Sequence, residues 1–270
     1  MNPDPAIRSL DPLTGGREGA ATYPAEAFSF LDAVEGRHFW FLARNRTIGE
    51  WLIRCIPDVR NVRILEVGCG NGTVLAYLHK LGLQVVGVDL FRTALTQCRE
   101  RVRVPLYQAD AMRLPFRDRF GVVGLFDCLE HFDRPEIILS EAWRVLETGG
   151  YVLVTVPAIP SLYGWVDRLS GHRQRYSRAV LMALLETSGF KVLRASYFMT
   201  GVLPAMAASR FLNELLFRNT PDEQKPFADQ FKVLPGVNSM LGWICAIDRL
   251  VLRAINLPIG GSLIAVAIKK

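Results

Sequence analysis

The sequence predicts an α/β fold in which a mainly parallel sheet carries helices on both faces. Segments of strand length alternate with segments of helical periodicity between residues 62 and 199, the pattern of a sheet built from strand–helix–strand units. A glycine-rich turn at residues 68–72 joins the first expected strand to a helix, and the second expected strand ends in Asp89. A carboxylate there can accept hydrogen bonds from two ribose hydroxyls. These observations predict a nucleotide-type cofactor site.

Each expected element follows from the periodicity of its apolar residues. Two helices are expected between residues 26 and 56, ahead of the first strand. The expected strands are 63–67, 85–88, 104–108, 121–126, 151–156, 191–198 and 262–268. The expected helices that follow the first strand are 74–81, 93–101, 136–146 and 179–188, with two more segments of helical character at 202–217 and 238–255.

The chain divides into five expected regions. They are a loose tail (1–22), an N-terminal helical cap (23–61), a cofactor-binding core (62–199), a hydrophobic helical insertion (200–260) and the final strand of the core (261–270). The tail holds prolines, glycines and scattered charges but no apolar signal segment. We therefore expect a cytoplasmic protein.

The composition limits the classes of partner that the chain is expected to have. Half of the residues are apolar and the mean hydropathy is +0.18, yet no apolar run reaches the roughly 18 residues of a membrane span. Five cysteines show no paired or metal-type spacing. The net charge of +6 is dispersed along the chain, so we expect no nucleic acid partner. Attraction to the inner face of an anionic membrane explains the positive charge as well as attraction to a phosphorylated substrate does.

The glycine turn distinguishes two classes of cofactor. A dinucleotide site needs a third glycine three residues after the second, but here Thr73 holds that place and Gly72 comes one residue early. Glu66 stands two residues before Gly68, where it can meet a cationic amino group. With Gly68, Gly70 and Gly72, this segment resembles the first motif of the class I S-adenosylmethionine (SAM)-dependent methyltransferases.

The resemblance covers about residues 60 to 200. It continues through the segments 108–111, 122–126, 127–131 and 149–154. It implies a Rossmann-like seven-stranded methyltransferase sheet with helices on both faces, an N-terminal helical cap and a helical insertion before the last strand. It also implies SAM as the cofactor.

The resemblance assigns further cofactor contacts. Asp89 would accept the ribose hydroxyls, and Leu90 would cover one face of the adenine. In the family, Asp110 or the backbone of Ala111 contacts the adenine amino edge, and Phe126 lies beside the methionine part. For Asp110 a plain turn-forming role remains an alternative.

An aromatic cluster at residues 38–41 precedes Arg44. It looks like the N-terminal lid of many small-molecule methyltransferases, in which Trp40 would cover the cofactor and an arginine would bind its carboxylate. A core aromatic stripe with Arg44 on the surface is the alternative.

Asp127, Glu130, His131 and His172 form the candidate catalytic group. A helix beginning at Asp127 would place the first three on one face, and the loop of His172 would close over the same cleft. The pattern is similar to that of ubiquinone-pathway O-methyltransferases and small-RNA 2′-O-methyltransferases, which bind a divalent metal through Glu-x-x-Glu-His and a later histidine, although Asp127 replaces the first Glu. Three interpretations stay open: a metal bound by all four residues, metal-free acid/base catalysis by Asp127 or a histidine, and structural capping.

We therefore expect a SAM-dependent methyltransferase that acts on an oxygen of an apolar or lipid-linked small molecule. N- or C-methylation, SAM binding without turnover, and an NAD-dependent oxidoreductase are the alternatives. The two apolar helices expected in the insertion have three possible roles. They would pack on the sheet or on a second subunit in a homodimer, cover a hydrophobic substrate, or lie in the membrane interface.

Overall fold

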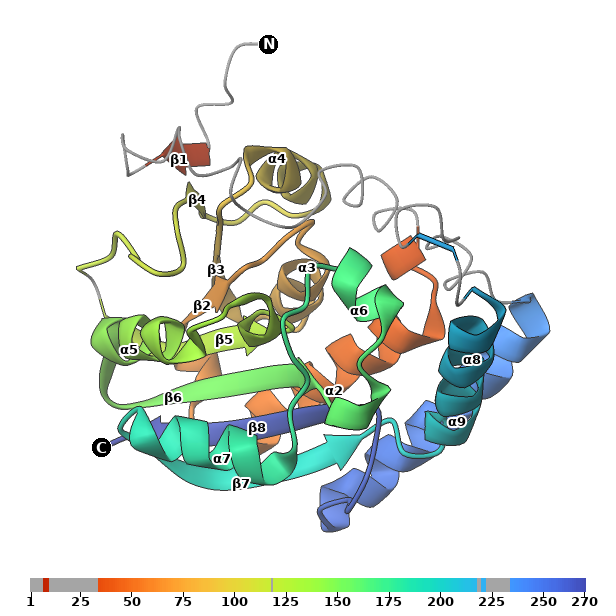
Figure 1. Ribbon diagram of the computed structural model, residues 1–270. Helices are drawn as coiled ribbons and strands as arrows, with labels where there is room; N and C mark the ends of the chain where they lie inside the picture. Colours follow the sequence, from red (N-terminus) through yellow and green to blue (C-terminus); the bar gives the residue numbers. More distant parts are fainter. Residues whose placement is uncertain (1–6, 10–33, 118, 218–219, 222–233) are drawn as a thin grey trace.

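The computed structural model describes residues 7–9, 34–117, 119–217, 220–221 and 234–270. Its described strands form one eight-stranded sheet in the order β1-β4-β3-β2-β5-β6-β8-β7 (Figure 1). The strands are β1 (Ile7–Ser9), β2 (Arg63–Val67), β3 (Gln84–Asp89), β4 (Leu106–Gln108), β5 (Phe120–Phe126), β6 (Leu146–Pro157), β7 (Phe190–Phe198) and β8 (Ser262–Lys269). All pairs from β1 to β6 are parallel, and β8 runs antiparallel between β6 and β7. The predicted α/β class is confirmed.

Helices cover both faces of the sheet, as predicted. The α-helices are α2 (Phe39–Cys55), α3 (Thr73–Lys80), α4 (Arg92–Arg101), α5 (Pro135–Val145), α6 (Trp165–Leu169), α7 (Arg178–Thr187), α8 (Leu203–Leu216) and α9 (Pro235–Ala254), and the 3₁₀ turns are η3 (Val59–Asn61), η4 (Leu129–His131) and η5 (Pro160–Leu162). Helices α2, α3, α4 and α9 contribute to one hydrophobic cluster, and α5 and α7 contribute to a second cluster on the opposite face. The sheet is therefore buried on both faces, which is why its central strands are almost wholly apolar.

Two expectations for the N-terminal part change. Residues 7–9 fall in the region expected as a loose tail, but they pair in parallel with β4 and add an eighth strand. An edge strand such as β4 presents unpaired backbone groups that favour this addition. The first of the two helices expected between residues 26 and 56 falls largely outside the described residues, and the second is α2.

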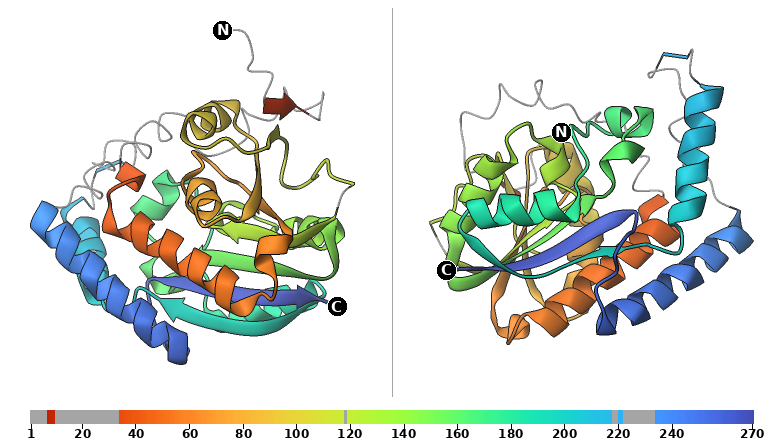
Figure 2. Two further views of the ribbon diagram at one scale, coloured as in Figure 1. Left: turned by 180° about the vertical axis from the view of Figure 1, so that it is seen from behind. Right: turned by 60° about the horizontal axis from the view of Figure 1, so that its bottom comes forward.

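The insertion contains the two expected helices, α8 and α9. Helix α9 lies along α2 (Figure 2). Asn238 of α9 accepts a hydrogen bond from the Phe39 amide (2.9 Å) and donates one to the Arg37 carbonyl (3.0 Å). These contacts attach α9 to the beginning of α2. Over the described residues, no helix is both long and apolar enough to cross a membrane.

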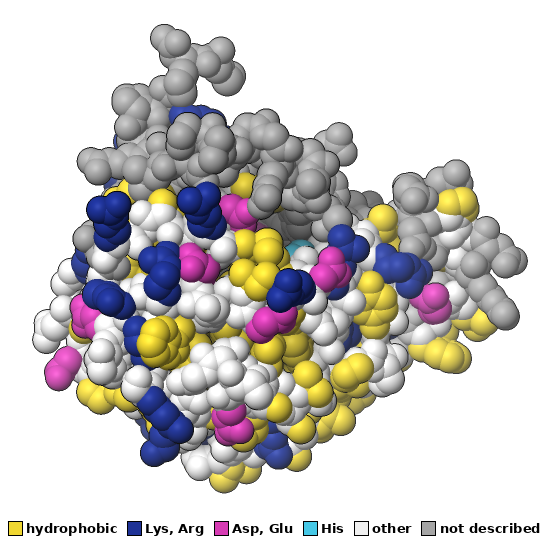
Figure 3. All heavy atoms as spheres, turned by 60° about the vertical axis from the view of Figure 1, so that its left-hand side comes forward, with side chains coloured by type: hydrophobic (Ala, Val, Ile, Leu, Met, Phe, Trp, Pro, Cys, Tyr) yellow, Lys and Arg dark blue, Asp and Glu magenta, His cyan; other side chains and the backbone are white. Residues whose placement is uncertain are grey.

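The outer faces of α8 and α9 are apolar, and we call them the insertion surface. No residue of α8 is buried, and Phe211 and Trp243 are 71% and 74% exposed. The large exposed apolar residues of this surface are Phe211, Leu212, Leu215, Leu216, Val237, Met240, Trp243, Ile247, Leu250 and Val251. On the face drawn in Figure 3, by contrast, the Lys and Arg side chains of the described residues are scattered among acidic and apolar ones.

Candidate active site

A cavity of about 860 Å³ opens at the carboxyl ends of the parallel strands, the usual place for ligands in open α/β sheets. Its glycine-turn half is formed by residues of the ranges 66–74, 88–91 and 109–112. Its insertion half is formed by residues of the ranges 166–175 and 202–210 together with Leu241. The volume lies toward the upper end of the usual range for small-molecule pockets, about 300 to 1,000 Å³, so the cavity suits a large ligand or two ligands side by side.

The three glycines of the turn all have positive φ, at +73°, +50° and +75° for Gly68, Gly70 and Gly72. A Cβ atom on Gly70 would meet no protein atom within 4 Å, because that position faces the cavity. A Cβ atom on Gly72 would lie 2.3 Å from the Cys98 sulfur. Gly72 does not line the cavity; its lack of a side chain lets the beginning of α3 pack against α4.

Two buried carboxylates face the glycine-turn half. Asp89 accepts hydrogen bonds from the Gly70 amide (2.8 Å) and the Phe91 amide (2.9 Å), and burial, which outweighs these bonds, raises its pKa. Glu66 is 2% exposed, and its Oε2 atom has no hydrogen-bond partner in the described residues. Burial raises the pKa of Glu66 well above its ordinary value. A cationic ligand group beside Glu66 would relieve this unfavourable burial.

The other sequence-predicted cofactor residues also line the cavity. These are Trp40, Leu90, Asp110, Ala111 and Phe126. Asp110 accepts a hydrogen bond from the Met112 amide (2.8 Å), which is the turn-forming role given as the alternative. Asp110 both forms the turn and lines the cavity, because the loop that it stabilises forms one wall of the cavity.

Arg44 and Asp127 bind each other, with 2.7 Å between Nη1 and Oδ2. Asp127 does not begin a helix: its φ is +51°, and only a 3₁₀ turn, η4, follows. The Thr155 carbonyl and hydroxyl hold the Asp127 amide, and the Thr155 hydroxyl donates to Asp127 Oδ1 (3.0 Å). The expectation that Asp127 shares a helical face with Glu130 is therefore wrong. Arg44 is largely buried and lines the cavity, so the alternative of a surface arginine is also wrong.

Glu130, His131 and His172 converge, each offering a ligand atom within 4.8 Å of the others. His131 Nδ1 lies 3.3 Å from the Gly171 carbonyl oxygen. Because a carbonyl oxygen only accepts, Nδ1 of His131 carries the proton, and Nε2 is the basic atom of the neutral ring. Burial, with His172 nearby, lowers the pKa of His131 to about 4, so this imidazole is neutral near pH 7.

Glu130 is completely buried, and neither carboxyl oxygen has a hydrogen-bond partner from another described residue. Burial, and secondarily the charge of Asp127, raises the pKa of Glu130 well above its ordinary value. One carboxylate and two imidazoles are a donor set that divalent transition metals accept. The cluster therefore fits a metal ion through three residues, but without Asp127, which belongs to the Arg44 pair.

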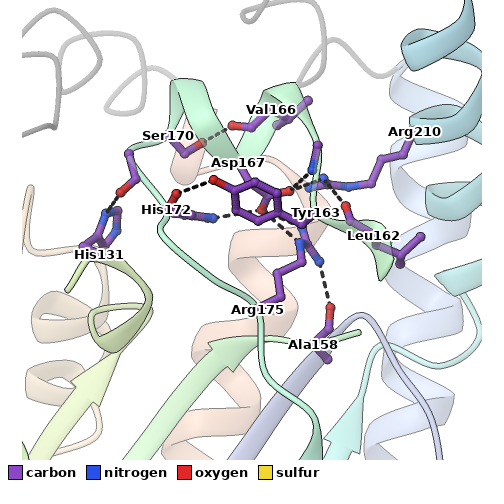
Figure 4. Close-up of polar contacts among 12 residues, drawn as sticks. His131, Ala158, Leu162, Tyr163, Val166, Asp167, Ser170, His172, Arg175 and Arg210 are labelled. Carbon is purple, nitrogen blue, oxygen red and sulfur yellow. Dashed lines mark hydrogen bonds and ion pairs between the residues drawn. The ribbon is translucent and has the colours of Figure 1, made fainter. Parts of the chain in front are cut away.

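Asp167, Arg175 and Arg210 form an ionic cluster that the sequence interpretation missed (Figure 4). Asp167 is fully buried; its Oδ1 atom lies 2.9 Å from Arg175 Nη2, and its Oδ2 atom lies 2.7 Å from Arg210 Nη1. Oδ1 also lies 3.0 Å from His172 Nδ1, so Asp167 orients the His172 ring. Burial opposes ionisation, but the bond from His172 and the charges of Arg210 and Arg175 outweigh it and hold the pKa of Asp167 well below its usual range.

Comparison with known proteins bears directly on this cavity. The family model described as a methyltransferase domain matches residues 65–154, which run from within β2 to within β6 and include the glycine turn. A Mycolicibacterium smegmatis protein named a probable S-adenosylmethionine-dependent methyltransferase is 31% identical over 195 residues, covering 71% of this chain and 70% of that protein. A fatty-acid O-methyltransferase from the same organism is 36% identical over 104 residues, covering 36% of this chain and 38% of that protein.

A solved structure has a similar fold. Phosphoethanolamine N-methyltransferase 2 of Haemonchus contortus, in complex with S-adenosyl-L-methionine, superposes with a TM-score of 0.59 at 18% sequence identity, covering 95% of this chain and 60% of that chain. At this identity the likeness concerns the fold alone.

Proposed function

The chain belongs to the class I SAM-dependent methyltransferases, and from this we propose that it transfers a methyl group to an oxygen of an apolar small molecule. One observation carries the proposal: the insertion half extends the cavity beyond the glycine turn, and its wall includes the apolar side chains of Val202, Met206 and Leu241. The fatty-acid specificity in the name of one relative supports the same class of acceptor.

The residues of the glycine-turn half fit the cofactor. Glu66 would receive the amino group, Asp89 the ribose hydroxyls, and the open side of Gly70 the amino-acid end. Bound SAM supplies an activated methyl group on sulfur. The protein contributes mainly by holding the acceptor oxygen in line with that group, since positioning removes much of the entropic barrier. Trp40 and Arg44 would close the cavity from α2.

His131 and His172 are the proposed proton acceptors when the acceptor is a hydroxyl. The pKa of His131, lowered by burial to about 4, leaves Nε2 unprotonated near pH 7, where it can act as a weak base. We expect His131→Ala to lower kcat by about 10² to 10⁴, with SAM affinity by calorimetry unchanged. A variant with full activity, or one that no longer binds SAM, would contradict this role.

A metal held by Glu130, His131 and His172 is the second candidate, because Glu130 is buried without a partner from another described residue. A chelator separates the two mechanisms. Activity that falls in chelator and returns with manganese or zinc identifies a metal, whereas full activity in chelator leaves only the imidazole base.

The insertion surface is the proposed site of peripheral contact with the inner face of a membrane. Burying one large apolar side chain in lipid stabilises binding by about 1.5 to 3 kcal/mol, so Trp243→Glu should weaken flotation with anionic liposomes by about tenfold or more. Val180→Glu is the matched control, because Val180 is 54% exposed on α7, away from this surface. Equal loss in both variants would refute specific contact.

Self-association is the competing use of the insertion surface. Sedimentation of wild type and Trp243→Glu without lipid tests it. A wild-type dimer that the substitution converts to monomer would make this surface a homodimer interface instead.

The overall activity is tested by incubating the protein with SAM and an extract of apolar metabolites. We expect a metabolite that gains 14 mass units and whose new methyl group is bonded to oxygen. A methyl group on nitrogen or carbon would correct the class of acceptor. SAM binding with no methylated product would favour a binding protein without turnover, and binding of NAD in place of SAM would refute the cofactor assignment.

A further inference from the structure

The charges that line the cavity are separated into two groups. Carboxylates gather in the glycine-turn half, at Glu66, Asp89 and Asp110, where the proposed cofactor would bring its cationic and hydroxyl groups. In the insertion half, Arg173, Arg175 and Arg210 line the wall, whereas Asp167 does not. Arg173 pairs with Asp133, which also lines the cavity, so the arginines of the insertion half that matter here are Arg175 and Arg210.

The positive charge of the insertion half is not fully compensated. Asp167 is one carboxylate shared by two guanidinium groups, those of Arg175 and Arg210, and both are mostly withdrawn from solvent. Burial and the neighbouring Arg175 lower the pKa of Arg210 despite the attraction of Asp167. Glu214, one turn further along α8, is exposed, so water screens its charge. Among Asp167, Arg175 and Arg210 themselves, one positive charge is therefore in excess.

Arg210 has hydrogen-bond donors that the described residues do not use. Arg175 uses Nε and Nη2 on Asp167 and Nη1 on the Ala158 carbonyl. Arg210 uses Nη1 alone, on Asp167 Oδ2 and on the Leu162 carbonyl (3.1 Å). Its Nε and Nη2 groups make no hydrogen bond within the described residues. A guanidinium with a free edge can bind the oxygen pair of a carboxylate or phosphate.

Apolar side chains line the same half of the cavity as Arg210. Met206 lies one helical turn before Arg210 on α8, and Val166, Ala205 and Leu241 also line this half. From this juxtaposition we propose that the insertion half binds an amphiphilic acid, with its anionic head on Arg210 and its aliphatic chain against α8 and α9. This inference rests on the proposed function, because it names the acceptor class of the same site.

Calorimetry with C12 probes, in the presence of demethylated SAM, tests the proposal. The probes are dodecanoate, dodecyl phosphate and dodecanol, which share one chain and differ in the head group. We expect wild type to bind at least one of the two anions roughly tenfold to hundredfold more tightly than dodecanol, the range for charge-assisted hydrogen bonds. The tighter of the two identifies the head group as carboxylate or phosphate.

Arg210→Met keeps the length of the side chain and removes its charge, so the preference for the anion should disappear. Arg210→Lys should restore part of it. Arg253→Met is the matched control, because it removes an arginine of α9 that lies on Glu50 outside the cavity, and it should keep the full preference.

Equal binding of dodecanol and both anions by wild type, or a preference that survives in Arg210→Met, overturns the proposal. The wild-type comparison decides the matter even if Arg210→Met does not fold. If the wild type does not bind demethylated SAM, the proposed function itself is refuted, so the two failures are distinguishable.

Discussion

Gly70→Val should abolish SAM binding while leaving the protein folded. The added side chain would fill the open space beside the turn that faces the cavity, where the amino-acid end of the cofactor is proposed to lie. Valine at a φ of +50° also strains the backbone by about 1 to 3 kcal/mol. Calorimetry with SAM, together with circular dichroism to verify folding, measures the result.

Gly149→Val is the matched control for the strain. Gly149 has a φ of +77°, and its Cβ position is likewise open, but it lies outside the cavity lining. Both variants should lose similar stability, and only Gly70→Val should lose SAM. If both variants bind SAM as wild type does, the glycine turn is not the cofactor site.

Asp167→Ala should lower the free energy of unfolding by about 3 to 5 kcal/mol, the cost of leaving buried charges without their partner. Arg175 and Arg210 would face each other without a shared carboxylate. Urea unfolding measures the change. Glu50→Ala is the control: Glu50 also binds two arginines, Arg249 and Arg253, but that cluster is more exposed, so about 1 kcal/mol or less is expected.

The stabilisation by the Asp167 carboxylate should depend on pH. Because the folded-state pKa of Asp167 is lowered, its contribution to stability is fully present above the unfolded pKa of about 3.9 and is lost as the pH falls through the lower, folded value. Below about pH 4 the stabilities of wild type and Asp167→Ala should therefore approach each other. A constant difference down to the acid transition would contradict this.

Local patterns predicted the parts of the site that depend on neighbouring residues. Gly70 and Asp89 could be placed because a glycine turn after one parallel strand and a carboxylate at the end of the next meet at the same edge of the sheet. The structure joins them by a hydrogen bond of 2.8 Å. The two insertion helices were predictable because they are long and their apolar content is high.

Contacts between distant residues were not predictable. The conformation of Asp127 depends on Thr155, 28 residues away, and its ion pair depends on Arg44, 83 residues away. Arg210 reaches Asp167 across 43 residues, and neither residue belongs to a periodic pattern. The one local feature that could have drawn attention to Asp167 is its position at the beginning of α6, where its carboxylate accepts a hydrogen bond from the Gly164 amide.

The place of β8 in the sheet has a consequence for folding. Strand β8 lies between β6 and β7, although it follows both in the chain and the whole insertion precedes it. During synthesis, β7 and the edge of β6 that faces away from β5 therefore stay unpaired while α8 and α9 are made, and the apolar surfaces of these helices are exposed before β8 is complete. We expect the nascent chain to depend on chaperones until β8 arrives and joins the two edges in one step.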